Sequence, residues 1–291
     1  MISWTSRALN VRQSGEGSAV LVLVHGFGAD QNVWAPYMEA FARHFRVVTY
    51  DLACAGSADS EFFDMRRHDT LDGYVADLLS ILDGLEVSRC FFVGHSVSGM
   101  IGLLAAAKRP ELIEKLIMIG SSACYLDLEG YQGGFTLEAI EQLLLCVARD
   151  YRAWVNEYAP LVVGRPAEDP ATLNFASSLA AMRPDIALAT ARMILLSDYR
   201  DRLDGIAVPT AVFQSRADPA VPLAAARYLH DHIKDSVLEV LDATGHMPHM
   251  TSAALVMAAL WRHLAPDRMP LMTAPSPEMD GSGAAAADWR P

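Results

Sequence analysis

The side chain best placed for nucleophilic chemistry in this chain is the hydroxyl of Ser96. It lies in the segment Gly94-His95-Ser96-Val97-Ser98-Gly99, after the apolar run 90–93 and before a stretch that we expect to be an amphipathic helix. A serine in a tight strand-to-helix turn exposes its hydroxyl at the sheet edge, as in the nucleophile-elbow pattern G-x-S-x-G. Here Ser98 replaces the last glycine of that pattern and Gly99 follows it. Taken alone, the motif also fits a serine that only caps a helix.

A serine hydroxyl needs a base to remove its proton, and the base needs a carboxylate to orient it. His246 lies in a glycine-bearing loop after the apolar run 237–241, and Asp218 lies in the loop after the run 210–214. The loop after the earlier run 116–119 contains no acid. The order Ser96, Asp218, His246 is the one that a hydrolase sheet produces. The sequence therefore predicts a catalytic triad at one sheet edge.

Stabilisation of a developing oxyanion requires hydrogen-bond donors near the serine. The segment His25-Gly26-Phe27-Gly28 directly follows the apolar run 19–24. Acyl-transfer enzymes of this architecture place one donor in such a loop and another just after the nucleophile. We expect the backbone amides of Phe27 and Val97 to form the oxyanion hole, with flanking glycines that allow the chain to turn closely.

The other histidines have less direct interpretations. His25 and His95 flank the predicted site and are expected to hold loops, while His249 either faces the cavity or caps the last helix. The spacing of His246 and His249 is compatible with a metal pair, but no further ligands accompany it, so we predict no metal. The three remaining histidines of the C-terminal part are expected at the surface: His230, His232 and His263.

Short apolar runs alternate with stretches of helical period, which predicts an α/β fold with a mostly parallel sheet covered by helices. The expected strands lie at residues 19–24, 45–50, 90–93, 116–119, 210–214 and 237–241. Between the fourth and fifth runs, a region of helical periodicity predicts a four-helix lid, with helices at 137–147, 151–158, 171–182 and 185–196. Four prolines there are expected to act as breakers: Pro160, Pro166, Pro170 and Pro184. A last helix is expected at 252–264.

These elements divide the chain into a core at residues 1–123 and 204–268, a helical lid at 124–203 and a flexible tail at 269–291. The tail is rich in Pro, Ala, Gly and Ser, with too little hydrophobic pattern to pack.

Composition excludes several classes of protein. The 291 residues include 52% hydrophobic ones, enough for a large core, and the formal charge of −12 disfavours nucleic acid and anionic membranes as partners. The four cysteines are scattered, which is typical of reduced thiols. The N-terminal residues contain no signal core or membrane span, so we expect a cytoplasmic protein.

With these motifs in place, the chain resembles the α/β-hydrolase superfamily, and within it the group of bacterial RsbQ-type stress-response hydrolases and plant strigolactone and karrikin receptors. The resemblance covers about residues 9–264, and a substituted elbow glycine is typical of that group. The resemblance rests on these segments: residues 25–34, 51–57, 62–67, the elbow at 94–98, and residues 109–112, 131–135, 153–156 and 182–185.

This resemblance implies a buried apolar cavity between sheet and lid that opens on Ser96. The residues implied to bind substrate are Phe27, His95, Tyr125, Trp154, Tyr158 and Leu195. Trp154 and Tyr158, four residues apart on a helix, also fit plain core packing. Tyrosine at positions 125 and 158 adds hydroxyl groups where some plant members have phenylalanine, so the ligand need not be the same.

The expected function is that of a cofactor-free serine hydrolase for a small apolar ester or butenolide-type lactone. The resemblance also implies a ligand-sensing signalling role of RsbQ type, with a regulatory protein partner. Two alternatives stay open: a non-catalytic or slow-turnover ligand receptor, and a cofactor-free haloperoxidase or C–C hydrolase on the same scaffold.

Overall fold

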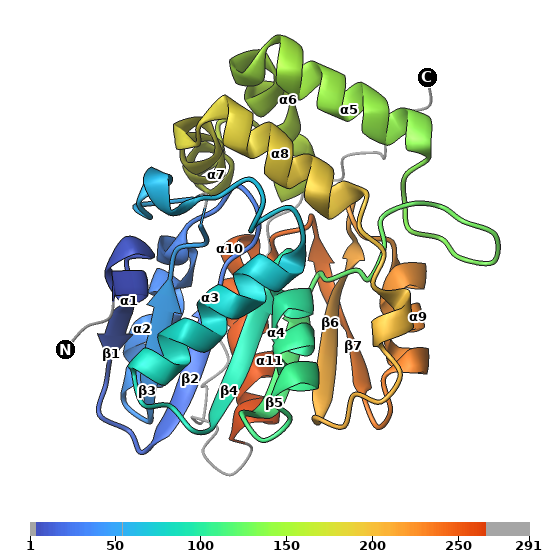
Figure 1. Ribbon diagram of the computed structural model, residues 1–291. Coiled ribbons are helices and arrows are strands. Elements are labelled where there is room, and N and C mark those ends of the chain that lie inside the picture. The colour runs from blue at the N-terminus through green and yellow to red at the C-terminus, as the bar shows by residue number, and fades with distance from the viewer. Residues whose placement is uncertain (1–3, 54, 266–291) are drawn as a thin grey trace, which may run out of the picture.

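The computed structural model describes residues 4–53 and 55–265 and shows one twisted sheet with helices on both faces (Figure 1). The seven strands run in the order β1-β3-β2-β4-β5-β6-β7, with β1 antiparallel to β3 and the other pairs parallel. The strands are β1 Arg12–Ser14, β2 Ala19–Val24, β3 Phe45–Tyr50, β4 Cys90–His95, β5 Ile113–Ile119, β6 Thr210–Ala217 and β7 Val237–Thr244.

All six strands expected from apolar runs are present, and β4 to β7 extend beyond the expected bounds. Strand β1 was missed because it consists of Arg12, Gln13 and Ser14 at the sheet edge, where two of the three residues are exposed. A polar edge strand has no apolar run or alternation by which the sequence could reveal it.

Helices cover each sheet face because successive strand residues point to opposite sides. In β2, Val22 contributes to a core cluster with α3, α4 and α9, whereas Leu21 and Leu23 pack in a second cluster with α2 and α11. The core helices are α1 Trp4–Ala8, α2 Ala35–Ala42, α3 Leu71–Gly84, α4 Val97–Lys108, α9 Leu223–His232, α10 Pro248–Thr251 and α11 Ala253–Leu264.

The helix after Ser96 differs from expectation. Every residue of α4 from Val97 to Ala106 is buried, so this helix is not amphipathic. It lies against the sheet on one side while α3 packs against it on another, which leaves little of its surface for water. The start of the helix that follows Ser96 is therefore enclosed in the core.

A helical insertion between β5 and β6 lies above the carboxyl ends of the strands (Figure 1). It consists of α5 Leu137–Arg149, α6 Tyr151–Val163, α7 Pro170–Ala181 and α8 Pro184–Leu195. These four helices correspond to the predicted lid, which confirms the expected fold class.

The expectation that Pro160 breaks a helix was wrong. Helix α6 continues through Pro160 and ends at Gly164, whose φ of 71° is left-handed. A proline inside a helix removes one backbone donor, but its carbonyl still accepts, here from the N–H of Gly164 at 3.0 Å. Pro170 and Pro184 occupy the first positions of α7 and α8, where a proline favours helix initiation.

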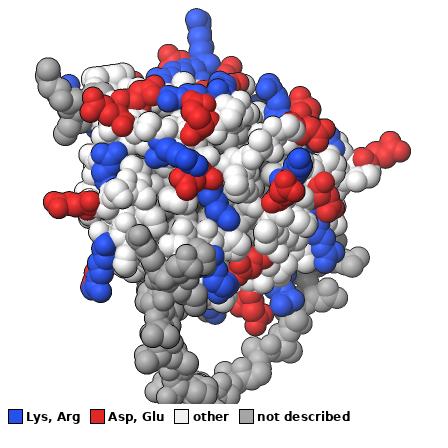
Figure 2. Space-filling model, turned by 90° about the horizontal axis from the view of Figure 1, so that it is seen from below, with Lys and Arg blue, Asp and Glu red and all other residues white. Residues whose placement is uncertain are grey.

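Charges are mixed over the surface away from the lid: Figure 2 shows acidic and basic side chains interspersed on that face. Cys90, Cys124 and Cys146 are free thiols, whereas Cys54 and the expected tail at 269–291 lie outside the described residues. No helix of the described residues is long and apolar enough to cross a membrane.

Candidate active site

Ser96 occupies a strained turn between β4 and α4, with φ of 54° and ψ of −122°. The neighbouring glycines are required by close packing: a Cβ on Gly94 would lie 2.4 Å from the Ser98 carbonyl carbon, and one on Gly99 would lie 2.1 Å from the Ser121 Oγ. A non-glycine residue with positive φ is uncommon, and such strain is typical of functional sites. The turn thus presents the Ser96 hydroxyl at the carboxyl edge of the sheet.

The replacement of the elbow glycine by Ser98 has a structural consequence. The Ser98 hydroxyl is fully buried and donates a hydrogen bond to the carbonyl oxygen of His25 at 2.5 Å. The elbow is thereby tied to the loop that carries Phe27. On the other side, the Ser121 hydroxyl donates to the carbonyl oxygen of Ser96 at 2.7 Å.

Ser96, His246 and Asp218 form one hydrogen-bonded chain although they lie far apart in the sequence. The His246 Nε2 is 2.9 Å from the Ser96 Oγ, and the His246 Nδ1 is 2.8 Å from the Asp218 Oδ2. With Asp218 ionised, Nδ1 carries the proton and donates to the carboxylate, so Nε2 can accept the serine proton. This arrangement can activate a hydroxyl for attack on a carbonyl carbon.

The carboxylate of Asp218 is buried, and both of its oxygens accept hydrogen bonds from neighbouring groups. Its Oδ1 accepts from the N–H groups of Ala220 and Val221 at 2.8 and 3.0 Å, and its Oδ2 accepts from the Gln214 Nε2 at 3.0 Å in addition to His246. Burial opposes ionisation, but the charge of His246 and these hydrogen bonds outweigh it and lower the pKa of Asp218. The acid is therefore held in its charged form.

The N–H groups predicted to form the oxyanion hole are unpaired among the described residues, and a hydrogen bond from His25 fixes the orientation of one of them. No backbone or side-chain acceptor among the described residues takes the N–H of Phe27 or of Val97. The His25 Nε2 accepts from the N–H of Leu52 at 3.0 Å, so its Nδ1 carries the proton and donates to the Gly26 carbonyl oxygen at 2.8 Å. Because a trans peptide directs its C=O and N–H oppositely, this bond turns the N–H of Phe27 away from His25.

The histidines behind the site are buried and neutral. Desolvation lowers the pKa of His25, and more strongly that of His95, whose Nε2 donates to the His246 carbonyl oxygen at 2.8 Å. His249 stacks on Trp34 with a ring-centroid distance of 5.0 Å, and both its nitrogens lack partners among the described residues. His249 thus neither lines the cavity nor caps a helix, because its ring is enclosed by other aromatic rings.

The three C-terminal histidines expected at the surface differ in exposure. His232 is exposed, whereas His230 and His263 are half-buried and hydrogen-bonded to Ser236 and Glu239. Within the part of the chain that the structure describes, no group of three or more His, Cys, Asp or Glu residues is arranged to hold a metal ion.

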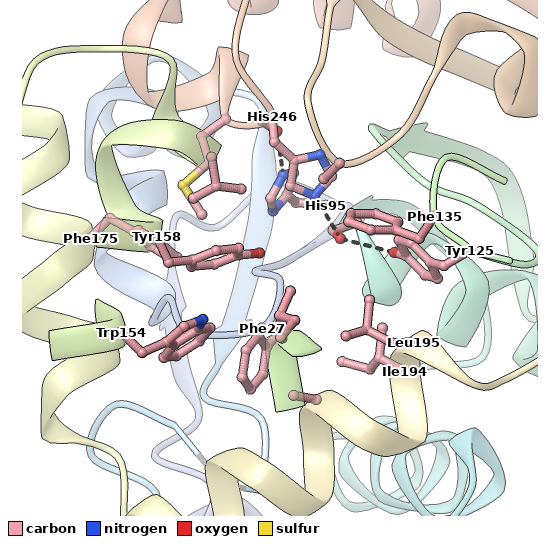
Figure 3. A pocket seen from close by; sticks show the side chains of 16 residues that line it. Phe27, His95, Tyr125, Phe135, Trp154, Tyr158, Phe175, Ile194, Leu195 and His246 are labelled. Carbon is pink, nitrogen blue, oxygen red and sulfur yellow. Dashed lines mark hydrogen bonds between the residues drawn. The ribbon is translucent and has the colours of Figure 1, made fainter. Parts of the chain in front are cut away.

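A cavity of about 50 Å³ lies between the sheet edge and the lid and reaches Ser96 and His246 (Figure 3). All six residues expected from the resemblance line it, and so do residues that sequence reasoning did not single out. The lining residues are Phe27, His95, Ser96, Tyr125, Phe135, Leu143, Trp154, Tyr158, Val162, Phe175, Ala191, Ile194, Leu195, Ala220, His246 and Met247.

The hydroxyl of Tyr125 lies 3.5 Å from the Ser96 Oγ, so one cavity phenol contacts the Ser96 hydroxyl. Burial raises the pKa of Tyr125 to about 12, which keeps it protonated. Residues that sequence reasoning missed include Gln214 and Ser121, which support Asp218 and Ser96. Ser121 reaches Ser96 across the ends of neighbouring strands, whereas Gln214 reaches Asp218 from four residues earlier in the same chain segment, and no motif marks either residue.

Comparison with known proteins agrees with this geometry. Residues 21–259 match the sequence family described as "Alpha/beta hydrolase family". The chain is 45% identical over 259 residues to a strigolactone esterase of Arabidopsis thaliana, covering 88% of this chain and 96% of that protein. It is 40% identical over 258 residues to a karrikin insensitive 2 receptor of Petunia hybrida, covering 88% and 96% respectively.

Among solved structures, a hydrolase from Oleispira antarctica superimposes with a TM-score of 0.86 and 32% sequence identity. The match covers 89% of this chain and 96% of that one. An enol-lactonase from Burkholderia xenovorans matches with a TM-score of 0.76 at 23% identity, over 87% of this chain and 96% of that one, which shows a shared fold.

Proposed function

This chain belongs to the alpha/beta hydrolase family, and on that premise we propose that it hydrolyses small apolar esters or lactones with Ser96 as nucleophile. The observation that carries the proposal is the unbroken hydrogen-bonded chain from the Ser96 Oγ through His246 to Asp218, at the floor of a mostly apolar cavity between sheet and lid. A lactone is included because two of the relatives at 40% identity or more are named as a strigolactone esterase and a karrikin receptor.

In the proposed mechanism, His246 takes the proton from Ser96 as the serine oxygen attacks the carbonyl carbon. The N–H groups of Phe27 and Val97 bind the oxyanion that forms. His246 then gives its proton to the departing alkoxide, which leaves an acyl group on Ser96. Water, deprotonated by the same imidazole, attacks that acyl group and releases the acid. Asp218 stays ionised throughout and orients the imidazole.

The direct test replaces Ser96 with alanine. We expect Ser96→Ala to abolish both the cleavage of p-nitrophenyl acetate and covalent labelling by a fluorophosphonate. Ser178→Ala, which removes a hydroxyl from lid helix α7, is the matched control and should keep both. Labelling of the Ser96→Ala protein would show that another residue is the nucleophile.

A second function, slow-turnover ligand perception, is supported by the similarity to a protein named as a receptor. In that case occupancy of the cavity by a small lactone changes the lid and thereby a surface that a regulatory protein recognises. Turnover distinguishes the two: many cycles per second on a small ester favours a metabolic esterase. One cycle per many minutes, together with a ligand-dependent thermal shift, favours a sensor. For either function we propose that the protein acts in the cytoplasm.

A further inference from the structure

Both backbone polar groups of Ser96 are held by one short segment, residues 119–121, at the end of the neighbouring strand. The N–H of Ser96 donates to the carbonyl oxygen of Ile119 at 2.7 Å, and the carbonyl oxygen of Ser96 accepts from the Ser121 hydroxyl at 2.7 Å. Ile119 is the last residue of β5, which lies beside β4 in the sheet (Figure 1). The strained turn at Ser96 is therefore fixed on both sides of its Cα atom.

The middle residue of this segment, Gly120, leaves space for the proposed base and acid. Its φ is +60°, and a Cβ there would lie 3.3 Å from the His246 Nδ1 and 3.5 Å from the Asp218 Oδ2. The N–H of Gly120 donates to the carbonyl oxygen of Phe213 in β6 at 2.9 Å, which anchors the segment in the sheet. The partner of the Ser96 carbonyl thus comes from a firmly held part of the chain.

The side chain of Ser121 occupies the space that Gly99 leaves free. A Cβ on Gly99 would lie 2.1 Å from the Ser121 Oγ and 3.0 Å from the Ser121 Cβ, and the Ser121 side chain is fully buried. Gly99 follows Ser98, one position later than the last glycine of the usual elbow pattern. This glycine therefore lets the Ser121 hydroxyl approach the Ser96 carbonyl.

A hydrogen bond to the Ser96 carbonyl also sets the direction of the Val97 N–H. The two groups belong to one planar peptide unit, so they rotate together and point in opposite directions. The carbonyl accepts from the Ser121 hydroxyl and, at 3.1 Å, from the N–H of Gly99. The Val97 N–H on the other side has no acceptor among the described residues. Hydrogen bonds to a carbonyl polarise the peptide, which makes its N–H a stronger donor.

We propose that Ser121 is a positioning residue for the oxyanion hole, which aims the N–H of Val97 at the developing oxyanion and strengthens it as a donor. His25 has the corresponding place behind the N–H of Phe27, because it donates to the carbonyl of the peptide that contains this N–H. Each proposed oxyanion donor then has its own side chain behind it. This inference rests on the proposed hydrolase function and adds a residue that acts through Val97 without touching the substrate.

The test compares Ser121→Ala with Ser122→Ala, a closely matched control. The two serines are adjacent and buried, and the Ser122 hydroxyl donates to the carbonyl oxygen of Cys124 at 2.6 Å. Each substitution removes one hydrogen bond from a carbonyl that keeps a second donor. We therefore expect thermal unfolding to shift by a similar amount in both variants, so that a difference in activity reports on the oxyanion hole.

Three quantities are measured: kcat/KM for p-nitrophenyl acetate, and the inhibition constants of butyl trifluoromethyl ketone and butyl methyl ketone. The fluorinated ketone forms an anionic adduct with a reactive serine, whereas the methyl ketone binds uncharged. Loss of an entire oxyanion donor costs about a hundredfold or more in kcat, but Ser121→Ala keeps the Val97 N–H. We expect kcat/KM to fall about fivefold and the fluorinated ketone to bind about fivefold more weakly, as loss of one hydrogen bond implies.

Binding of the methyl ketone to Ser121→Ala should stay within about twofold of the wild type, and Ser122→Ala should stay within that range for all three quantities. Wild-type values of kcat/KM and of fluorinated-ketone inhibition in Ser121→Ala would overturn the inference. Equal weakening of both ketones would overturn it as well, because the effect would not depend on the charge of the oxyanion. A wild type that neither cleaves p-nitrophenyl acetate nor is labelled by a fluorophosphonate would instead overturn the proposed function, and this inference with it.

Discussion

The backbone N–H of His246 donates a hydrogen bond to the carbonyl oxygen of Val162 at 2.8 Å, which joins the catalytic loop to the last turn of lid helix α6. The His246 carbonyl is held from the other direction by the His95 Nε2. The imidazole that we propose as the base for Ser96 is therefore positioned partly by the lid, and a displacement of α6 would move it.

Replacement of Gly245 should disrupt this junction. A Cβ on Gly245 would lie 2.0 Å from the carbonyl oxygen of Val163. The φ of +93° at Gly245 would also strain the backbone of any residue other than glycine. We expect Gly245→Ala to lower kcat by about a hundredfold, since small misplacement of a catalytic group has effects of that order. Steady-state kinetics with a short p-nitrophenyl ester would measure it.

Gly205→Ala is the control for backbone strain alone. Gly205 has a similar φ of +85°, but no atom lies within 4 Å of an added Cβ. Its kcat should stay within about twofold of the wild type, with only a small loss of stability. Equal losses of activity in the two variants would mean that strain, and not contact with α6, is responsible.

Removal of the Ser98 hydroxyl should weaken the oxyanion hole. Ser98→Ala loses the hydrogen bond to the His25 carbonyl and with it the link between the elbow and the Phe27 loop. We expect kcat to fall about tenfold with little change in KM, because binding in the transition state is affected more than binding of the substrate. Ser197→Ala, which removes a hydroxyl bonded to Ile194 beyond the end of α8, is the control. A wild-type kcat in Ser98→Ala would contradict this role.

Asp218→Asn should keep the fold and lose most of the activity. The amide can still accept from backbone N–H groups, but it no longer fixes the proton of His246 on Nδ1 or stabilises the imidazolium. A loss of about 10⁴ in kcat is expected for such a change. Because the Asp218 pKa is lowered, the wild type should keep a charged acid to below pH 3.8 for as long as it stays folded. Activity of Asp218→Asn within tenfold of the wild type would argue for a different acid.

His249 should make the protein sensitive to acid. Burial lowers its pKa from 6.5 to about 3, so the unfolded state binds more protons between these values. The stability from neutral His249 is complete above pH 6.5 and is lost as the pH falls toward 3, by at most about 1.4 kcal/mol per pH unit.

His249→Phe, which keeps a ring against Trp34 and removes both unpartnered nitrogens, should flatten this dependence. Urea unfolding at pH 7 and pH 5 would measure it. Burial also lowers the pKa values of His25 and His95, so part of the acid sensitivity should remain in the variant. The same slope of unfolding free energy against pH in both proteins would refute the role of His249.

The sequence alone determined the fold class and placed the proposed catalytic groups on loops that follow strands. Apolar runs of strand length separated by helical periods can form only a narrow range of parallel sheets, and carboxyl ends of parallel strands meet at one edge. Ser96, Asp218 and His246 each follow such a run, so their meeting was predictable without any distance. The lid helices were predictable from their helical periodicity, although Pro160 does not end its helix as expected.

The tertiary structure alone decided which contacts hold these groups. Ser98 reaches His25, Ser121 reaches Ser96, and Val162 reaches His246, each between elements that are distant in the sequence. Such contacts depend on the direction of each group and on its distance from its partner to within a few tenths of an ångström. Periodicity and motif spacing carry none of these quantities, because they describe which face a residue occupies and not what lies opposite it.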